Sequence, residues 1–474
     1  MTFSPQQAIL SLGRMFYDPV EAADFPQTIL RYRNDRAAAT VGLEGLTDDE
    51  WIAHFGRFQP LAGSLPQPLA LRYHGHQFRH YNPDIGDGRG FLFAQMRDSD
   101  GRLLDLGTKG SGITPYSRRG DGRLTLKGGV REILATEMLE ALGVNTSKTF
   151  SLIETGEALH RGDEPSPTRS AVMVRLSHGH IRIGSFQRLA YNQQAHEMRT
   201  LVDYVRRNFY GDYGLRALYD HETLPSFYSW KPEIEAQGDR NAAAHLLAMV
   251  AESTAKLAAQ YMAAGFVHGV LNSDNINVTG ESFDYGPWRF APTWDPGFTA
   301  AYFDEAGLYA FARQPEAIHW DVMQLAISLR LIEDEAPLVA ALDPFPQRFR
   351  EEMREAILWR LGVRFYDDRR DLALVEAIEK VLQITGVSID RFFFDWFGGI
   401  APADYGEPFD EIKALLSPYS PRKPRDHSYW SDPEPCWMLI EEVEAIWAPI
   451  AEKDDWSALH AKVAQIRRMG EALA

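Results

Sequence analysis

The fold is decided by one polar loop in the second half of the chain, His268-Gly269-Val270-Leu271-Asn272-Ser273-Asp274-Asn275-Ile276. Asn275 follows His268 by seven positions, and after a turn at Gly280 the chain continues as Phe283-Asp284-Tyr285-Gly286. Amide and carboxylate oxygens are ligands that Mg²⁺ accepts in proteins. The loop therefore supplies two candidate metal ligands, Asn275 and Asp284.

The order of these residues matches the catalytic loop and the metal-binding motif of protein kinases. That pattern reads H-R-D-L-x-x-x-N and is followed by D-F-G, in which the asparagine and the second aspartate hold Mg²⁺. One element is missing, because Val270 occupies the position of the catalytic aspartate and can neither accept a proton nor orient a hydroxyl. The nearest carboxylate in the sequence is that of Asp274.

Three features upstream of this loop occur in the order found in kinases. Alternating glycines at residues 86–90 precede a predicted strand, where backbone amides can close on phosphate oxygens without a side-chain clash. Lys109 ends a second predicted strand, and Glu132 lies on a helix predicted over residues 130–142. Each feature alone has an ordinary interpretation, a tight turn for the glycines and solvated surface charges for the other two. Their common order favours a nucleotide site in which Glu132 holds Lys109.

Arginines gather around the same segments. A polar loop at residues 117–123 contains Arg118 and Arg119, and Arg175 and Arg182 follow later in the chain. Arginines suit bidentate binding of phosphate oxygens, and surface salt bridges are the alternative interpretation. The histidines at positions 74, 76 and 80 are interpreted as core or loop residues, because no second ligand cluster has a matching spacing.

The sequence pattern predicts β-structure before about residue 190 and helices after it. A hairpin is expected from residues 91–94 and 103–106, and further strands at 171–175 and 181–186. Apolar periodicity predicts helices over 246–261 and 349–361, and proline-rich residues 417–435 predict a loop before a last helical pair. We expect an N-terminal extension (1–70), a small lobe (71–190), a helical large lobe (191–330) and a C-terminal helical extension (331–474).

The composition excludes several classes of protein. The 474 residues are 45% hydrophobic and 24% charged, which is typical of a globular protein. The net charge of −17 repels a phosphate backbone, so we expect no nucleic-acid partner. Neither a signal-peptide pattern nor an apolar run long enough to cross a bilayer occurs in the sequence. We therefore expect a cytoplasmic protein without a membrane partner.

Residues from about 25 to 330 resemble the selenoprotein O family (SelO, also called YdiU), protein-kinase-like pseudokinases that act as protein adenylyltransferases. The resemblance implies an α+β, bilobal protein-kinase-like fold, and it rests on motifs longer than the general kinase pattern. These motifs are Tyr73-His74-Gly75-His76-Gln77-Phe78, Gly86-Asp87-Gly88-Arg89, Lys109-Gly110-Ser111-Gly112, Thr114-Pro115-Tyr116-Ser117-Arg118, Gly120-Asp121-Gly122-Arg123, Arg131-Glu132, Arg182 with Gly184 and Phe186, and Gly265 to Asn275 with Asp284-Tyr285-Gly286-Pro287.

The resemblance also implies a reaction and a role for each site residue. ATP would bind in an orientation flipped relative to ordinary kinases, so that AMP is transferred to a protein hydroxyl with release of pyrophosphate. Asp274 would accept the proton of the target serine, threonine or tyrosine, and Asn275 and Asp284 would bind Mg²⁺ or Mn²⁺. The residues implied to hold the nucleotide are Gly86, Gly88, Arg89, Lys109, Asp121, Gly122, Glu132, Arg175, Arg182 and Asp284.

The C-terminal part departs from the resemblance. Many members end in a cysteine or Cys-x-x-selenocysteine tail linked to redox control, whereas this sequence ends Gly470-Glu471-Ala472-Leu473-Ala474. The single cysteine, Cys436, has no intrachain partner, so disulfide regulation is not expected.

Two alternatives remain open at this point. Spacing alone does not say which phosphate faces the acceptor, so a kinase that uses Asp274 as a displaced base fits the same residues. A nonenzymatic pseudokinase scaffold that binds ATP fits them as well.

Overall fold

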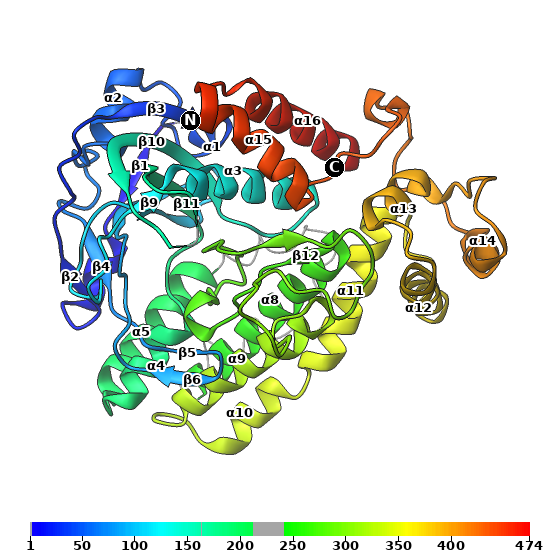
Figure 1. Ribbon diagram of the computed structural model, residues 1–474. Coiled ribbons are helices and arrows are strands. Elements are labelled where there is room, and N and C mark those ends of the chain that lie inside the picture. Colours follow the sequence, from blue (N-terminus) through cyan, green and yellow to red (C-terminus); the bar gives the residue numbers. More distant parts are fainter. Residues whose placement is uncertain (1, 163, 212–240) are drawn as a thin grey trace.

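The computed structural model describes residues 2–162, 164–211 and 241–474, and its first part is built on an antiparallel sheet. The strand order is β2-β4-β7-β8-β11-β10-β3, with β1 beside β7 and β9 beside β11 (Figure 1). The strands are β1 (Ser4–Gln6), β2 (Tyr17–Pro19), β3 (Ile29–Arg33), β4 (Leu69–Leu71), β7 (Leu92–Arg97), β8 (Leu103–Lys109), β9 (Leu124–Thr125), β10 (Lys148–Leu159) and β11 (Thr168–Ser177). The fold is of the α+β class, as predicted, because helices predominate after this sheet.

The predicted hairpin is confirmed as β7 and β8. Arg97 pairs with Leu103 at the turn, and Leu92 pairs with Gly107 at the open end. The Asp98 side chain holds the turn, since its Oδ1 accepts the backbone N–H of Asp100 at 3.0 Å and of Arg102 at 2.8 Å. β8 is buried along its length, so Lys109 at its end is carried into the interior.

The N-terminal 70 residues, predicted only as an extension, contribute strands and helices to the fold. Their strands β1, β2 and β3 pair with later strands of the sheet, and two helices, α1 (Asp35–Thr40) and α2 (Asp48–Phe55), follow β3. Pro19 lies in β2, the edge strand, where a missing backbone N–H costs no ladder hydrogen bond.

The helix predicted over residues 130–142 is α3, which spans Leu126–Ala141. Thr125 caps its start, because its side chain accepts the N–H of Gly128 at 3.1 Å. Val130, Ile133 and Met138 are fully buried on one face of the helix. Glu132 lies on the same helix and is also buried.

The strand predicted at residues 181–186 is wrong. Ile183–Tyr191 form helix α4, followed by α5 (Ala195–Phe209). Ile181 and Ile183 lie two positions apart on either side of Arg182, which imitates strand alternation in a short window. In the structure Ile183, Phe186 and Leu189 are buried together, which is the three-residue spacing of a helix face.

The predicted helices over 246–261 and 349–361 are confirmed as α8 (Ala242–Ala264) and α11 (Phe345–Leu361). α8 ends at Gly265, whose φ of 70° closes the helix in the left-handed region. Part of the predicted helical region, residues 212–240, lies outside the described residues. The other helices of this part are α9 (Gln314–Leu329), α10 (Glu335–Leu342), α12 (Asp368–Thr385), α13 (Ile389–Asp395) and α14 (Asp410–Leu416).

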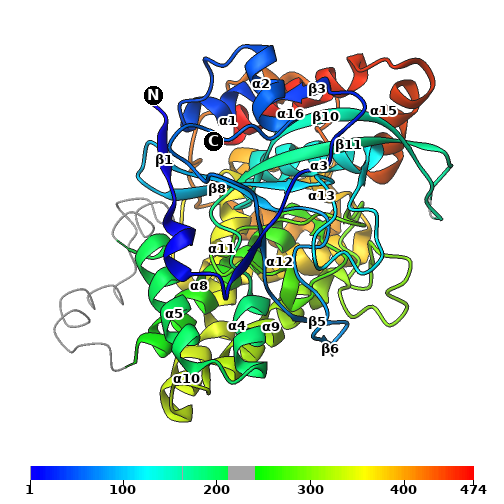
Figure 2. The same cartoon turned by 90° about the vertical axis from the view of Figure 1, so that its left-hand side faces the viewer.

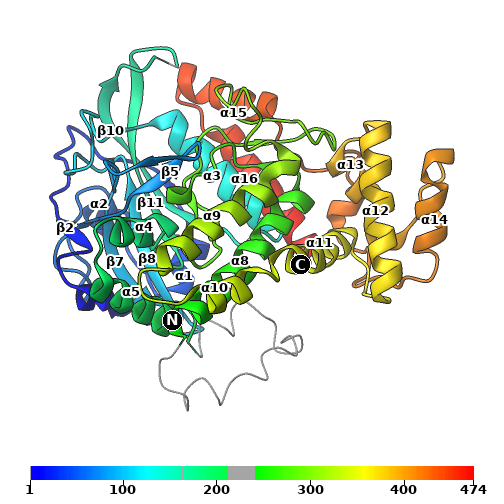
Figure 3. The ribbon, with the colours of Figure 1, turned by 90° about the horizontal axis from the view of Figure 1, so that it is seen from below.

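The helices α4, α5 and α8–α11 lie below the sheet in two perpendicular views (Figures 1 and 2). α12, α13 and α14 project to one side of this body (Figure 3). Two short antiparallel pairs complete the elements near the polar loop: β5 (Gly75–Gln77) with β6 (His80–Asn82), and β12 (Phe266–Val267) with β13 (Arg289–Phe290). Among the described residues, none of the helices has the length and apolar character to cross a membrane.

Residues 417–435 form the predicted loop-like arm, interrupted by one 3-10 turn at Ser428–Ser431. The expected last helical pair follows as α15 (Ile440–Lys453) and α16 (Ser457–Leu473). α16 packs on α3, as the red and cyan helices in Figure 1 show. Cys436 at the end of the arm is buried and free.

A buried ion pair fixes α16 to α3. Arg467 donates to the two carboxylate oxygens of Glu137 at 2.8 and 2.6 Å, and the Tyr32 hydroxyl donates to the same group at 2.7 Å. Burial alone would raise the pKa of Glu137, but these hydrogen bonds and the Arg467 charge outweigh burial and lower it. The ionised carboxylate is therefore the form that the fold stabilises.

We expect Arg467→Met to lower the free energy of unfolding by about 2 kcal/mol at neutral pH, because Glu137 loses its nearest charged donor and keeps only the longer contact with Arg36 at 3.5 Å. A depressed folded-state pKa contributes stability above the unfolded value and loses it as the pH falls. The difference between wild type and variant should therefore shrink as the pH drops below the ordinary glutamate value of 4.5. Urea unfolding of wild type and variant at pH 7 and at pH 4 measures the two free energies of unfolding at each pH. The account is contradicted if the difference between wild type and variant is the same at both pH values.

Candidate functional site

A cavity of about 790 Å³ opens between the sheet and the polar loop. Its volume is in the range of small-molecule sites. It is lined by the glycine-rich segment at 85–90, the end of β8, the loop at 116–123 and the segments around 274 and 284. Further lining residues are Tyr73, Gln77, Arg161, Arg175, His180 and Arg182. All predicted site residues except Glu132 line it, namely Gly86, Gly88, Arg89, Lys109, Asp121, Gly122, Arg175, Arg182, Asp274, Asn275 and Asp284.

The glycines at 86–90 allow two loops to pack closely at the mouth of the cavity. A Cβ on Gly90 would lie 2.0 Å from the carbonyl oxygen of Thr108, and one on Gly86 would lie 2.5 Å from the ring of Tyr116. The Ser117 hydroxyl donates to the carbonyl of Gly88 at 2.5 Å, which ties the second loop to the first. These positions therefore require glycine because neighbouring segments of the protein pack too closely for a side chain, whether or not the glycines also contact a ligand.

Lys109 and Glu132 form a buried ion pair between β8 and α3. Burial lowers the pKa of Lys109, and the Glu132 carboxylate opposes this shift. The ammonium group also donates to the carbonyl oxygen of Tyr285 at 3.2 Å, so it touches the segment that carries Asp284. Glu132 lies behind the cavity wall and positions the lysine that lines it.

Asp284 is held by two buried arginines. Its carboxylate accepts from Arg175 at 2.5 Å and from Arg182 at 2.6 Å, and its φ of 60° lies in the left-handed region that non-glycine residues rarely adopt. Burial alone would raise the pKa of Asp284, but Arg175, Arg182 and Lys109 together hold it well below its usual range. The cavity as a whole is lined by eight arginine or lysine side chains and four aspartates, and this surplus of positive charge suits phosphate groups.

A second layer orients Arg175. Its Nε donates to Nε2 of His180 at 3.2 Å, so the ring proton is assigned to Nδ1, which lies 3.3 Å from Oδ2 of Asp105. Burial lowers the pKa of His180 and keeps the imidazole neutral. Asp105, His180 and Arg175 are thus linked by successive hydrogen bonds, and Arg175 in turn donates to Asp284.

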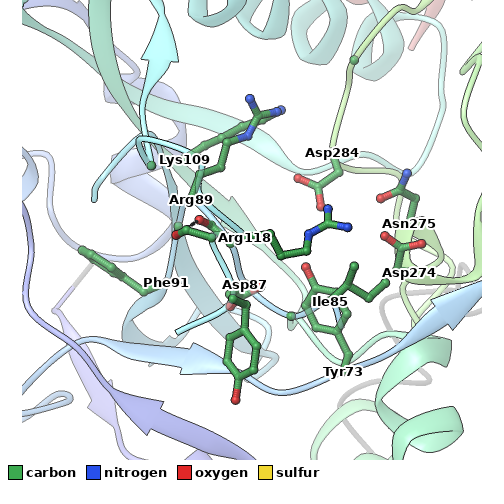
Figure 4. A pocket seen from close by; sticks show the side chains of 18 of the residues that line it. Tyr73, Ile85, Asp87, Arg89, Phe91, Lys109, Arg118, Asp274, Asn275 and Asp284 are labelled. Atoms are coloured by element: carbon green, nitrogen blue, oxygen red, sulfur yellow. Dashed lines mark hydrogen bonds between the residues drawn. The ribbon is translucent and has the colours of Figure 1, made fainter. Parts of the chain in front are cut away.

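Asp274 and Asn275 stand beside Asp284 on one side of the cavity, and Lys109 and Arg89 stand on the other (Figure 4). The Asn275 side-chain Nδ2 donates to the carbonyl oxygen of Val270 at 3.0 Å. The Oδ1 of Asn275 therefore lies on the side of the amide away from Val270. Burial raises the pKa of Asp274 to about 6, with Arg182 opposing the shift. Among the described residues, Asp274 Oδ1 has no hydrogen-bond partner.

The donor set fits a hard cation that also binds a phosphate. Mg²⁺ usually takes one or two carboxylates and completes its shell with substrate phosphates and water. Asn275 and Asp284 would offer oxygen atoms to such a cation next to a cationic cavity, and both Asp284 oxygens also accept from Arg175 and Arg182. The described residues contain no group of three His, Cys, Asp or Glu side chains that could hold a metal.

The sequence did not single out some residues that the structure brings to the cavity as ligand-holding groups. Gln77, Asp87 and His180 all line it. Asp87 lies inside the glycine motif at residues 86–90, so the sequence already indicated that it lies near the predicted nucleotide site. Gln77 stands in the motif at residues 73–78 that carries the resemblance, so its position was also indicated by the sequence. His180 reaches the site only through contacts between distant segments, for which local spacing carries no signal.

Comparison with known proteins identifies related sequences. A family described as "Protein adenylyltransferase SelO" matches residues 1–402. A protein named "Protein nucleotidyltransferase YdiU" from Synechococcus elongatus is 42% identical over 100% of this chain and 97% of its own length. Proteins of the same name from Gloeobacter violaceus and Vibrio cholerae are 42% and 35% identical, over 98% and 74% of this chain and 95% and 66% of their own lengths.

Proposed function

Because this chain belongs to the SelO family of protein adenylyltransferases, we propose that it transfers AMP from ATP to serine, threonine or tyrosine hydroxyls of proteins and releases pyrophosphate. Family membership and the relatives identify the class of activity, protein nucleotidyl transfer. The acceptor hydroxyls, the metal and the role of each residue are the proposal. The observation that carries it is the grouping of Asp274, Asn275 and Asp284 opposite Lys109, with valine at position 270.

We also propose that the fold is bilobal and protein-kinase-like. Residues 71–190 would be the nucleotide-binding small lobe and 191–330 the large lobe, with extensions at 1–70 and 331–474. The sheet strands β7, β8, β10 and β11 lie before residue 190, and the polar loop lies after it, with the cavity between them. This arrangement supports the proposed division.

In the proposed reaction the acceptor oxygen attacks the α-phosphorus of ATP, and the bond from that phosphorus to the oxygen bridging to the β-phosphorus breaks. Pyrophosphate leaves, and the hydroxyl proton passes to the Asp274 carboxylate. Lys109, Arg175 and Arg182 bind phosphate oxygens and neutralise the charge that develops on them. Gly86, Gly88, Arg89, Asp121 and Gly122 hold the nucleotide at the mouth of the cavity. Mg²⁺ or Mn²⁺ bound by Asn275 and Asp284 would add charge neutralisation at the phosphates.

The test is incubation of the purified protein with Mg²⁺ and either α-labelled or γ-labelled ATP. We expect label from the α-phosphate alone in the protein itself and in lysate proteins, and none with the Asp284→Ala variant. Protein label from the γ-phosphate alone would identify a kinase that uses Asp274 as its base. Nucleotide binding without any label transfer would identify a scaffold.

A further inference from the structure

The hairpin of β5 and β6 belongs to the early part of the chain but lies among the helices of the later part. In Figures 1 and 2 it stands beside α4 and α9, away from the sheet that its neighbours in sequence join. The segment at residues 73–82 contacts both α4 and the turn at Ser273–Asn275. It is therefore placed against the residue proposed as the proton acceptor.

Two backbone N–H groups of the hairpin donate to side-chain oxygens of the loop and so fix the hairpin to it. The N–H of His76 donates to the Ser273 hydroxyl at 2.7 Å, and the N–H of Phe78 donates to Oδ1 of Asn272 at 3.0 Å. These donors flank Gln77, and their acceptors are the two residues before Asp274. Gln77 is thus held in register with Asp274 across 197 positions of sequence.

A side chain of α4 ties the two segments together. Gln187 accepts from the Ser273 hydroxyl at 2.6 Å through Oε1, and its Nε2 contacts Nδ1 of His76 at 2.7 Å. The Tyr81 hydroxyl donates to the backbone carbonyl of Gln187 at 3.2 Å. The hairpin, α4 and the loop therefore form one connected polar network.

Asp274 itself touches the hairpin at two points. The Gln77 side-chain amide donates to Oδ2 at 3.4 Å, and Asn82 holds Gln77 by donating to its Oε1 at 3.0 Å. Gly75 faces Asp274 on the side opposite Gln77. A Cβ added to Gly75 would lie 2.9 Å from the Cβ of Asp274 and 3.0 Å from its Oδ1. The carboxylate is thus confined between an amide donor and a residue without a side chain.

We propose that the β5–β6 hairpin positions the Asp274 carboxylate for transfer, with Gln77 as the orienting donor and Gly75 as the residue whose missing side chain makes room for it. This inference rests on the proposed function, because it assigns a second group to the same proton transfer. Both are positioning residues, since they act through Asp274. A general base must lie within hydrogen-bond reach of the proton it takes, and small displacements reduce the rate strongly.

The experiment measures transfer of α-label from ATP, with kcat and the KM for ATP, in wild type and three variants. We expect Gln77→Leu to lower kcat about tenfold, the loss expected for one hydrogen bond to a charged group, with the KM for ATP unchanged. Gly75→Ala should lower kcat about 100-fold, because the added methyl displaces Asp274. His80→Leu, an exposed position on the same hairpin, should behave as wild type.

A double-variant comparison separates positioning from general damage. In an Asp274→Asn background, Gln77→Leu should have no further effect on kcat, because the group it orients is already neutral. A further tenfold loss in that background, or an unchanged kcat in both single variants, overturns the hairpin's role. A loss of kcat accompanied by an equal rise in KM, or by earlier thermal unfolding, also overturns it. Absence of α-label transfer by wild type would overturn the proposed function and with it this inference, whereas normal wild-type transfer with unaffected variants would overturn the inference alone.

Discussion

Replacing Asp284 with alanine should reduce α-label transfer by about 10³-fold or more, the largest loss expected for a single substitution in this protein. The substitution removes the carboxylate proposed to bind the metal. It also removes the group that holds Arg175 and Arg182 in place at 2.5 and 2.6 Å. Both effects act on the phosphates, so ATP binding in the presence of Mg²⁺ should weaken as well.

The same substitution leaves two buried arginines without their anion. Breaking a buried pair is costly, so Asp284→Ala should also unfold at a lower denaturant concentration. Asp284→Asn is the more informative variant, because it keeps the shape and a hydrogen-bond acceptor while it removes the charge. Titration of ATP with and without Mg²⁺ measures the metal-dependent part of binding. Asp284 would have no metal role if the asparagine variant transferred label at the wild-type rate.

We expect Asp274→Asn to lower kcat by about 10²- to 10⁴-fold while ATP binding stays near the wild-type level. The reason is that Asp274 lies beside the proposed metal ligands, and its carboxylate makes no hydrogen bond to Arg175 or Lys109. The measurement pairs single-turnover transfer with a direct binding titration. Asp84→Asn is a matched control, because Asp84 is an exposed aspartate next to the glycine segment and does not line the cavity.

Loss of ATP binding in Asp274→Asn would assign a different role to the residue. It would then be a metal ligand or a structural group of the loop, and proton transfer would need another acceptor. Unchanged kcat would exclude Asp274 as the base outright.

Local patterns predicted the elements that carry the site, and the structure confirms them where the pattern was long. The β7–β8 hairpin, α3, α8 and α11 follow from alternation or helical spacing over many residues. The six-residue window at 181–186 was too short for this, since alternating and helical patterns overlap there, and α4 was predicted as a strand. The short strands β1 to β3 were not predicted, because their partners are strands elsewhere in the sequence.

The residues of the candidate site likewise fall into those that the sequence predicted and those that it did not. Residues inside long motifs, such as Lys109 and Asp284, were predicted to lie together and line one cavity. Gln77 and His180 were not assigned, because their contacts join segments far apart in the chain. Gln77 meets Asp274 across 197 residues, and hydrogen bonding over such separations leaves no local periodicity to read.

The packing of α16 on α3 has a consequence for how the chain folds. The Glu137–Arg467 pair spans 330 positions, and Ile466 and Met469 of α16 share one core with Leu134 and Met138 of α3. A ribosome adds residues at roughly 5–20 per second, so α3 waits at least many seconds for the helix that covers it. During that interval the face of α3 that α16 covers lacks its partner, and Glu137 has only earlier residues such as Tyr32 and Arg36 to bind. Contacts of such high sequence separation slow folding, so the core that α3 shares with α16 is complete only after residues 457–473 have emerged.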